Sequence, residues 1–161
     1  MSVNKFLPHV LMFPEDDANR QVANGFVLVF PTRQIQILPE AGGWAQVRDR
    51  FISSHVSGME MHPDRLMVLL IDFDGNAHRL RDVQARIPEN LRHRVFVLGA
   101  WTEPEALRQA GLGSYETIGR ALGEDCLRES NTTWGHELLR HNADELERLL
   151  PHIRPILSSA P

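Results

Sequence analysis

The residues of this chain best suited to chemistry are two aspartates that follow a long apolar run. Asp72 and Asp74 come directly after six apolar residues, Leu66 to Ile71. A continuous apolar run that ends at a turn signal, here Gly75, predicts a strand buried on both faces. Because residues two apart on a strand point to the same side, we expect both carboxylates to project together. Such a pair favours a bound cation, and Mg²⁺ is typically held by one or two carboxylates with waters and substrate phosphates.

Further acidic residues are expected at the same edge of the sheet. Glu15 follows the first predicted strand, and Glu103 and Glu105 follow the fourth. Open α/β sheets bind their ligands at the C-terminal ends of the strands, so these carboxylates are candidates to complete the site. Asp16 and Asp17 are instead expected to cap the next helix, where negative charge suits the positive helix end.

The elements that must position these residues alternate between strand and helix. The predicted strands are 6–13, 33–38, 66–71 and 94–98. Helices are predicted over 18–29, 44–56, 104–110, 115–124 and 137–150. A further helix is marked by Leu80, Val83 and Ile87 and ends at Pro88. Residues 59–64 are expected to form a connector, and the residues around Pro151 and Pro155 a loose tail.

This βαβαβαβ order predicts an α/β fold, with a mostly parallel, Rossmann-like sheet of four strands and helices on both faces. A length of 161 residues suits a single domain, 1–161. Within it we expect an α/β core over 6–107 and a C-terminal helical extension over 108–157.

Composition limits the partners and the compartment. The net charge of −4 provides no global basic field, so contact with nucleic acid would need a local patch or a partner chain. Cys126 is the only cysteine, which excludes an intrachain disulfide and fits a reducing cytoplasm. The sequence shows neither a signal peptide nor an apolar run of about 18 residues, so we expect a cytoplasmic protein that does not span a membrane.

The order and spacing of the acidic positions resemble the TOPRIM domain family, closest to its small standalone and OLD-nuclease-like type. In that pattern a glutamate follows the first strand and a D-x-D follows the third, as Glu15, Asp72 and Asp74 do here. The Gly42-Gly43 loop after the second strand is also similar. The resemblance covers about residues 6–107.

Two positions depart from the family pattern. Asp16 stands where these proteins usually have glycine, and Asn19 stands where nuclease versions often carry another acid. In addition, Lys5 is the only lysine of the chain, whereas some OLD-type nucleases use a lysine near the site. These departures put cleavage in question more than metal binding.

The resemblance implies phosphodiester cleavage that depends on Mg²⁺ or Mn²⁺. Asp72 and Asp74 would hold the metal, and Glu15 would be a metal ligand or a general base. Glu103 or Glu105 would complete a second metal site, as in two-metal enzymes, unless they merely begin an ordinary helix.

Three side chains near the same edge are candidate phosphate contacts, namely Arg20, Arg79 and His78. The partners that this interpretation implies are a nucleic acid and either a partner ATPase or further copies of the chain.

Two other interpretations remain open. One is a non-catalytic, TOPRIM-like regulatory or assembly subunit that works with a partner ATPase. The other is a response-regulator receiver, which carries an acidic pair after its first strand and a phosphorylated aspartate at its third. Against a receiver, Asp72 lies 57 residues after Glu15, longer than that family's usual gap, and no lysine follows Lys5.

Overall fold

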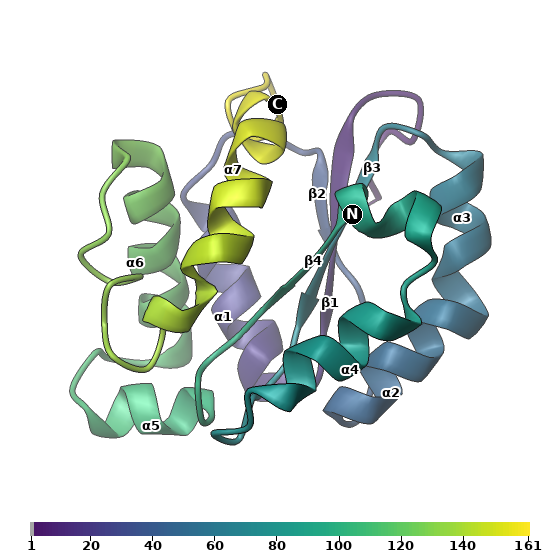
Figure 1. Cartoon of the computed structure of the whole chain (residues 1–161). Helices are drawn as coiled ribbons and strands as arrows, with labels where there is room; N and C mark the ends of the chain where they lie inside the picture. Colours follow the sequence, from purple (N-terminus) through teal and green to yellow (C-terminus); the bar gives the residue numbers. More distant parts are fainter. Residues whose placement is uncertain (1) are drawn as a thin grey trace.

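A parallel four-stranded sheet forms the centre of the protein, seen in a computed structural model that describes residues 2–161 (Figure 1). The strands are β1 (His9–Pro14), β2 (Ile35–Ile37), β3 (Arg65–Leu70) and β4 (Val95–Leu98), in the order β2-β1-β3-β4. The α-helices are α1 (Asp17–Leu28), α2 (Trp44–Arg50), α3 (Val56–Met61), α4 (His78–Arg86), α5 (Pro104–Gln109), α6 (Tyr115–Arg128) and α7 (Ala143–Leu157). The predicted α/β, Rossmann-like class is confirmed.

Helices cover both faces of the sheet. Along β1, Val10 and Met12 face a core shared with α1, α6 and α7, whereas Leu11 and Phe13 face a second core shared with α2, α3 and α4. Strand β3 alternates in the same way from Leu66 to Leu70, which explains the uninterrupted apolar run after Arg65.

The register of the sheet sets where the chemistry lies. Strands β1 and β3 pair in parallel over their whole length, and the last pair is Pro14 with Leu70. The residues that follow both strands therefore start side by side. The Glu15 N–H continues the ladder and donates to the Leu70 carbonyl at 2.8 Å.

Side chains from the start of the last helix, including its N-cap residue Asn142, cover the outer edge of β4. Asn142 both donates to the Gly99 carbonyl (3.0 Å) and accepts from the Gly99 N–H (3.1 Å). Glu145 accepts from the Val97 N–H at 2.9 Å. Arg148 donates to the Val95 carbonyl at 3.1 Å. These three residues satisfy backbone groups that an edge strand otherwise leaves free to pair with another chain.

Helices α1 and α6 touch through their backbones. A Cβ on Gly25 would lie 2.0 Å from the Glu116 carbonyl oxygen, and one on Gly119 would lie 1.9 Å from the Val22 carbonyl oxygen. Only glycine permits this approach, so these two positions determine how closely α6 lies against α1.

Several predicted boundaries were wrong. The first strand begins at His9 rather than Phe6, whose side chain is exposed in a turn. The second helix continues through a π-helical segment, Phe51–His55, into α3, so the first half of the predicted connector at 59–64 is helical. Burial of Phe51 and Met59 on the same face of the sheet accounts for this continuation.

The predicted helix 137–150 was also wrong. The helix spans Ala143–Leu157 instead, and Pro151 and Pro155 lie inside it rather than in a loose tail. Both prolines are exposed, whereas Ile153 and Ile156 are buried in the core. Burial of the apolar side of α7 outweighs the hydrogen bonds that the two prolines cannot donate.

None of the helices formed by residues 2–161 combines the length and the apolar character needed to cross a membrane.

Candidate metal centre

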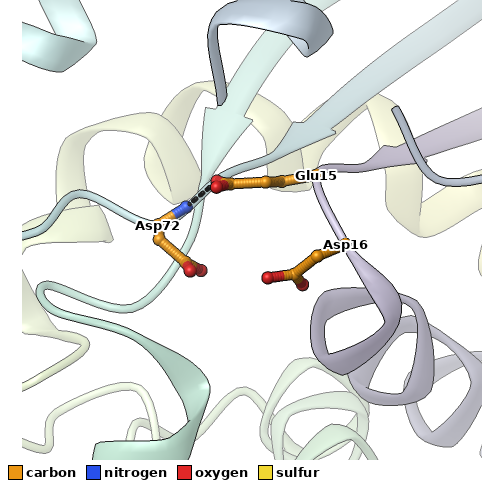
Figure 2. Close-up of side chains that lie close together, drawn as sticks. All are labelled: Glu15, Asp16 and Asp72. Carbon is orange, nitrogen blue, oxygen red and sulfur yellow. Dashed lines mark hydrogen bonds between the residues drawn. The ribbon is translucent and has the colours of Figure 1, made fainter. Parts of the chain in front are cut away.

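Three carboxylates meet where β1 and β3 end. Glu15, Asp16 and Asp72 each contribute one oxygen, and these oxygens all lie within 4.8 Å of one another. Figure 2 shows the Asp16 and Asp72 carboxylates facing each other, with Glu15 beside them. Glu15 and Asp16 follow β1, and Asp72 follows β3, so the parallel register of the two strands assembles the group.

Glu15 connects the two strand ends. Its Oε2 accepts a hydrogen bond from the Asp72 N–H at 2.6 Å (Figure 2). Its backbone carbonyl accepts from Gly42 at 2.8 Å and from Gly43 at 3.1 Å. Both glycines have positive φ values, 98° and 147°, which other residues rarely adopt. The Gly-Gly loop thus holds the backbone of an acidic site residue.

Asn19 links the two aspartates. Asp16 is the N-cap of α1, and its Oδ1 accepts from both the backbone N–H and the side-chain amide of Asn19, each at 2.9 Å. The same amide donates to Asp72 Oδ1 at 2.8 Å. Asn19 is buried, so it fixes both carboxylates against movement.

One oxygen of each carboxylate is free of hydrogen bonds from the described residues. Within residues 2–161, Oε1 of Glu15, Oδ2 of Asp16 and Oδ2 of Asp72 accept no hydrogen bond. Carboxylate oxygens are hard donors that suit Mg²⁺, Mn²⁺ and Ca²⁺. The donor set therefore fits a divalent cation.

Burial makes the carboxylates of Glu15 and Asp72 costly to ionise together. It raises the pKa of Glu15 to about 7; the hydrogen bond from Asp72 opposes this, and the charge of Asp72 adds to it. Burial likewise raises the pKa of Asp72 to about 6, against the hydrogen bond from Asn19 and with help from the charge of Asp16. A cation in the group would stabilise the ionised forms.

The raised pKa of Glu15 predicts a loss of stability with rising pH in the metal-free protein. From about pH 4.5 to about pH 7 the folded state retains a proton on Glu15 that the unfolded chain has released. The full shift corresponds to about 3.4 kcal/mol, and because Glu15 is only partly buried, solvent screening reduces the expected fall in the free energy of unfolding to about 2 kcal/mol. Urea unfolding in EDTA as a function of pH measures it.

The control for this prediction is Glu15→Gln, because other groups also titrate. Burial lowers the pKa of His9, His55 and His141, which makes stability rise with pH in the acid range. The difference between wild type and Glu15→Gln isolates the effect of Glu15. A difference that does not change from about pH 4.5 to pH 7 would contradict the prediction.

Asp74 lies outside the group of three. Strand β3 ends at Leu70, and Asp74 has a φ of 47°, so the alternation expected of a strand does not apply to it. Its exposed side chain forms an ion pair with Arg79 at 2.8 Å. The expected sharing of one cation by Asp72 and Asp74 is thus replaced by a site that joins Asp72 to Glu15 and Asp16.

Arg79 is the candidate phosphate contact that lies nearest this centre. Its Nη1 donates to the Asp72 carbonyl at 2.6 Å, and its guanidinium lies 4.5 Å from the centre of the Trp44 ring. With Asp74 as its third contact, the side chain is held firmly at the edge of the site.

The remaining candidates lie farther from the centre. Glu103 is the exposed N-cap residue of α5 and contributes to the raised pKa of Asp72. Glu105 is exposed in the first turn of α5. Arg20 pairs with Asp17 and, at 3.5 Å, with Glu40. His78 is exposed at the start of α4. None of the four belongs to the acidic group that residues 2–161 form.

Sequence reasoning assigned Asp16 only a capping role and treated Asn19 as a departure from a family pattern. Asp16 does cap α1, and the same carboxylate belongs to the acidic group. The available signal was the i, i+3 spacing from Asp16 to Asn19 directly after a strand, which places both side chains at the start of one helix.

No family model, no curated protein and no solved structure matches the chain. Residues 2–161 form an α/β protein in which Glu15, Asp16 and Asp72 lie close enough to hold a metal ion.

Proposed function

We propose that this protein cleaves phosphodiester bonds with the help of a divalent cation held by Glu15, Asp16 and Asp72, in a manner similar to TOPRIM-type nucleases. The observation that supports the proposal is the meeting of these three carboxylates at the C-terminal ends of β1 and β3. Ligands of open parallel sheets bind at this edge.

The residues of the chain have separable roles in this proposal. A bound Mg²⁺ or Mn²⁺ would stabilise negative charge on the phosphate oxygens and lower the pKa of a nearby water. Asn19 holds the Asp16 and Asp72 carboxylates in place. Burial raises the pKa of Glu15 to about 7 without a cation, and a bound cation would favour the ionised carboxylate, so Glu15 would act as a metal ligand at neutral pH. Arg79 places a positive charge beside the site, where a phosphate would bind.

Metal binding is the first test. Calorimetric titration of Mg²⁺ and Mn²⁺ above neutral pH should show binding to the wild type, and Asp72→Asn should weaken it at least about tenfold, or about 1.4 kcal/mol. Asp74→Asn is the matched control, because it removes the same charge from a carboxylate outside the group. Absence of binding to the wild type, or an equal loss in both variants, would contradict the proposed site.

Cleavage is the second test. Labelled single-stranded and duplex oligonucleotides, incubated with Mn²⁺, should be cut by the wild type and by Asp74→Asn, but at least about a hundredfold more slowly by Asp72→Asn. Equal cleavage by Asp72→Asn would indicate a contaminant. Metal binding without any cleavage would instead support a non-catalytic, TOPRIM-like subunit that acts with a partner ATPase.

One observation favours a second candidate function. The group joins an acidic pair after β1 to an aspartate after β3, an arrangement similar to that of response-regulator receivers. In that case Asp72 would accept a phosphoryl group from acetyl phosphate in the presence of Mg²⁺. Mass spectrometry of the intact chain, with Asp72→Asn as control, would detect the added phosphoryl group, and an unchanged mass would exclude this candidate.

A further inference from the structure

Apart from the metal centre, a concave site lies at the β4 edge of the sheet. It is a hollow of about 440 Å³ formed by α4, the segment that leads from α4 into β4, and α7. Three arginines line it, Arg81, Arg92 and Arg148. Among residues 2–161, no aspartate or glutamate forms part of its wall. The charged residues of this wall are therefore all positive, although the chain as a whole has a net charge of −4.

Two of these arginines are anchored by the backbone around them. Arg148 donates to the Arg92 carbonyl and to the Val95 carbonyl, each at 3.1 Å, and its guanidinium lies 4.6 Å from the centre of the Phe96 ring. Arg92 donates through Nε to the Ile87 carbonyl at 3.2 Å. Anchoring reduces the side-chain entropy that is lost when a ligand binds.

The positive charge of the hollow is only partly balanced. Glu145 is buried and pairs with Arg148 at 2.9 Å, so Arg148 contributes donors rather than net charge. Arg81 and Arg92 form no ion pair with any of residues 2–161. The terminal nitrogens of Arg92 also make no hydrogen bond within that part of the chain. Two uncompensated guanidinium groups therefore face a space large enough for phosphate.

We propose that this hollow binds the phosphate backbone of a nucleic acid strand and so holds a substrate of the metal centre. The inference rests on the proposed function and names its substrate class. Helix α4 borders both sites, since Arg79 in its first turn lies at the metal centre and Arg81 and Gln84 line the hollow. Phosphate contacts of this kind position a strand without reading its bases.

Binding can be measured without cleavage. We would follow the anisotropy of a labelled single-stranded oligonucleotide with the full chain in EDTA, over a range of salt concentrations. Arg81→Glu with Arg92→Glu should weaken binding about tenfold or more, and make the dependence of log K on log salt shallower by about 1.4, since each phosphate contact of a single strand contributes about 0.7. Arg81→Glu alone should give part of this loss without disturbing the fold, because Arg81 makes no hydrogen bond or ion pair within residues 2–161.

The matched control is Arg33→Glu with Arg128→Glu, which changes the net charge equally. Arg33 precedes β2 at the opposite edge of the sheet, and Arg128 ends α6. At about 0.15 M salt, charges more than about 8 Å from the ligand are largely screened, so the control should bind like wild type. An equal loss of affinity in the control would show that binding depends only on the net charge, and this result would overturn the proposal.

Two further outcomes would also overturn it. One is that the wild-type chain binds no oligonucleotide. The other is that inorganic phosphate displaces the oligonucleotide at concentrations comparable to those of the strand, which would assign the hollow to a small phosphate compound. Failure of the proposed cleavage is distinguishable from both. Arginine-dependent binding without cleavage would reject catalysis alone, and Asp72-dependent cleavage with arginine-independent binding would reject the hollow alone.

Discussion

Replacing Glu145 by leucine should lower the free energy of unfolding by about 3 kcal/mol. Glu145 is buried and serves two partners, the Val97 N–H at 2.9 Å and the Arg148 guanidinium. Leucine fills a similar volume but accepts no hydrogen bond. The Val97 N–H would then be buried without an acceptor, and Arg148 would lose the charge that holds it across the β4 edge.

Urea unfolding followed by circular dichroism measures this effect, and two variants calibrate it. Glu145→Gln keeps an acceptor for the Val97 N–H and removes only the charge, so it should cost less than Glu145→Leu. Glu147→Leu makes the same change on an exposed position of α7 and should shift stability by less than about 0.5 kcal/mol. Equal effects at positions 145 and 147 would show that the covered edge does not stabilise the fold.

Gly119→Ala should also lower the free energy of unfolding by about 3 kcal/mol, although alanine normally stabilises a helix by up to about 1 kcal/mol relative to glycine. The added methyl group would lie 1.9 Å from the Val22 carbonyl oxygen, which is a backbone atom and cannot rotate away. Helix α6 would have to move off α1, and Ile118 and Leu122 would lose part of their packing in the core. The sign of the change is thus opposite to that expected from helix propensity.

The measurement is again urea unfolding, with Glu124→Ala on the exposed side of α6 as the control. Gly25→Ala tests the same contact from the other helix, with a methyl group 2.0 Å from the Glu116 carbonyl oxygen. Either change alone already separates the two helices. The double variant should therefore lose less unfolding free energy than the sum of the losses in the two single variants. A Gly119→Ala protein as stable as wild type would contradict the close approach.

The sequence alone was sufficient to predict the sheet and the edge at which acidic residues gather. The run Leu66 to Ile71, the alternation of strands with helices and the acids after the first and third strands predicted a parallel α/β fold with a metal site at the C-terminal ends of the strands. These signals are local, since periodicity and turn residues determine which face of an element is buried. The position of Glu15 beside Asp72 follows from pairing two such strands in parallel.

The tertiary structure decided which residues belong to the site. Asp74 follows the strand in a turn with positive φ and pairs with Arg79, so its spacing from Asp72 did not predict its direction. Asp16 joins the group because α1 begins directly beneath the end of β3, where Asn19 reaches both aspartates.

Tertiary packing also determined the boundaries of α7 and the way in which the edge of β4 is covered. Two prolines in sequence predicted a tail, but a helix continues through them because its apolar side is buried against the sheet. Sequence by itself determined the elements and the edge at which they could act on a ligand. Long-range packing decided which carboxylates meet there, because a side chain's partner depends on the element packed against it and not only on its neighbours in the chain.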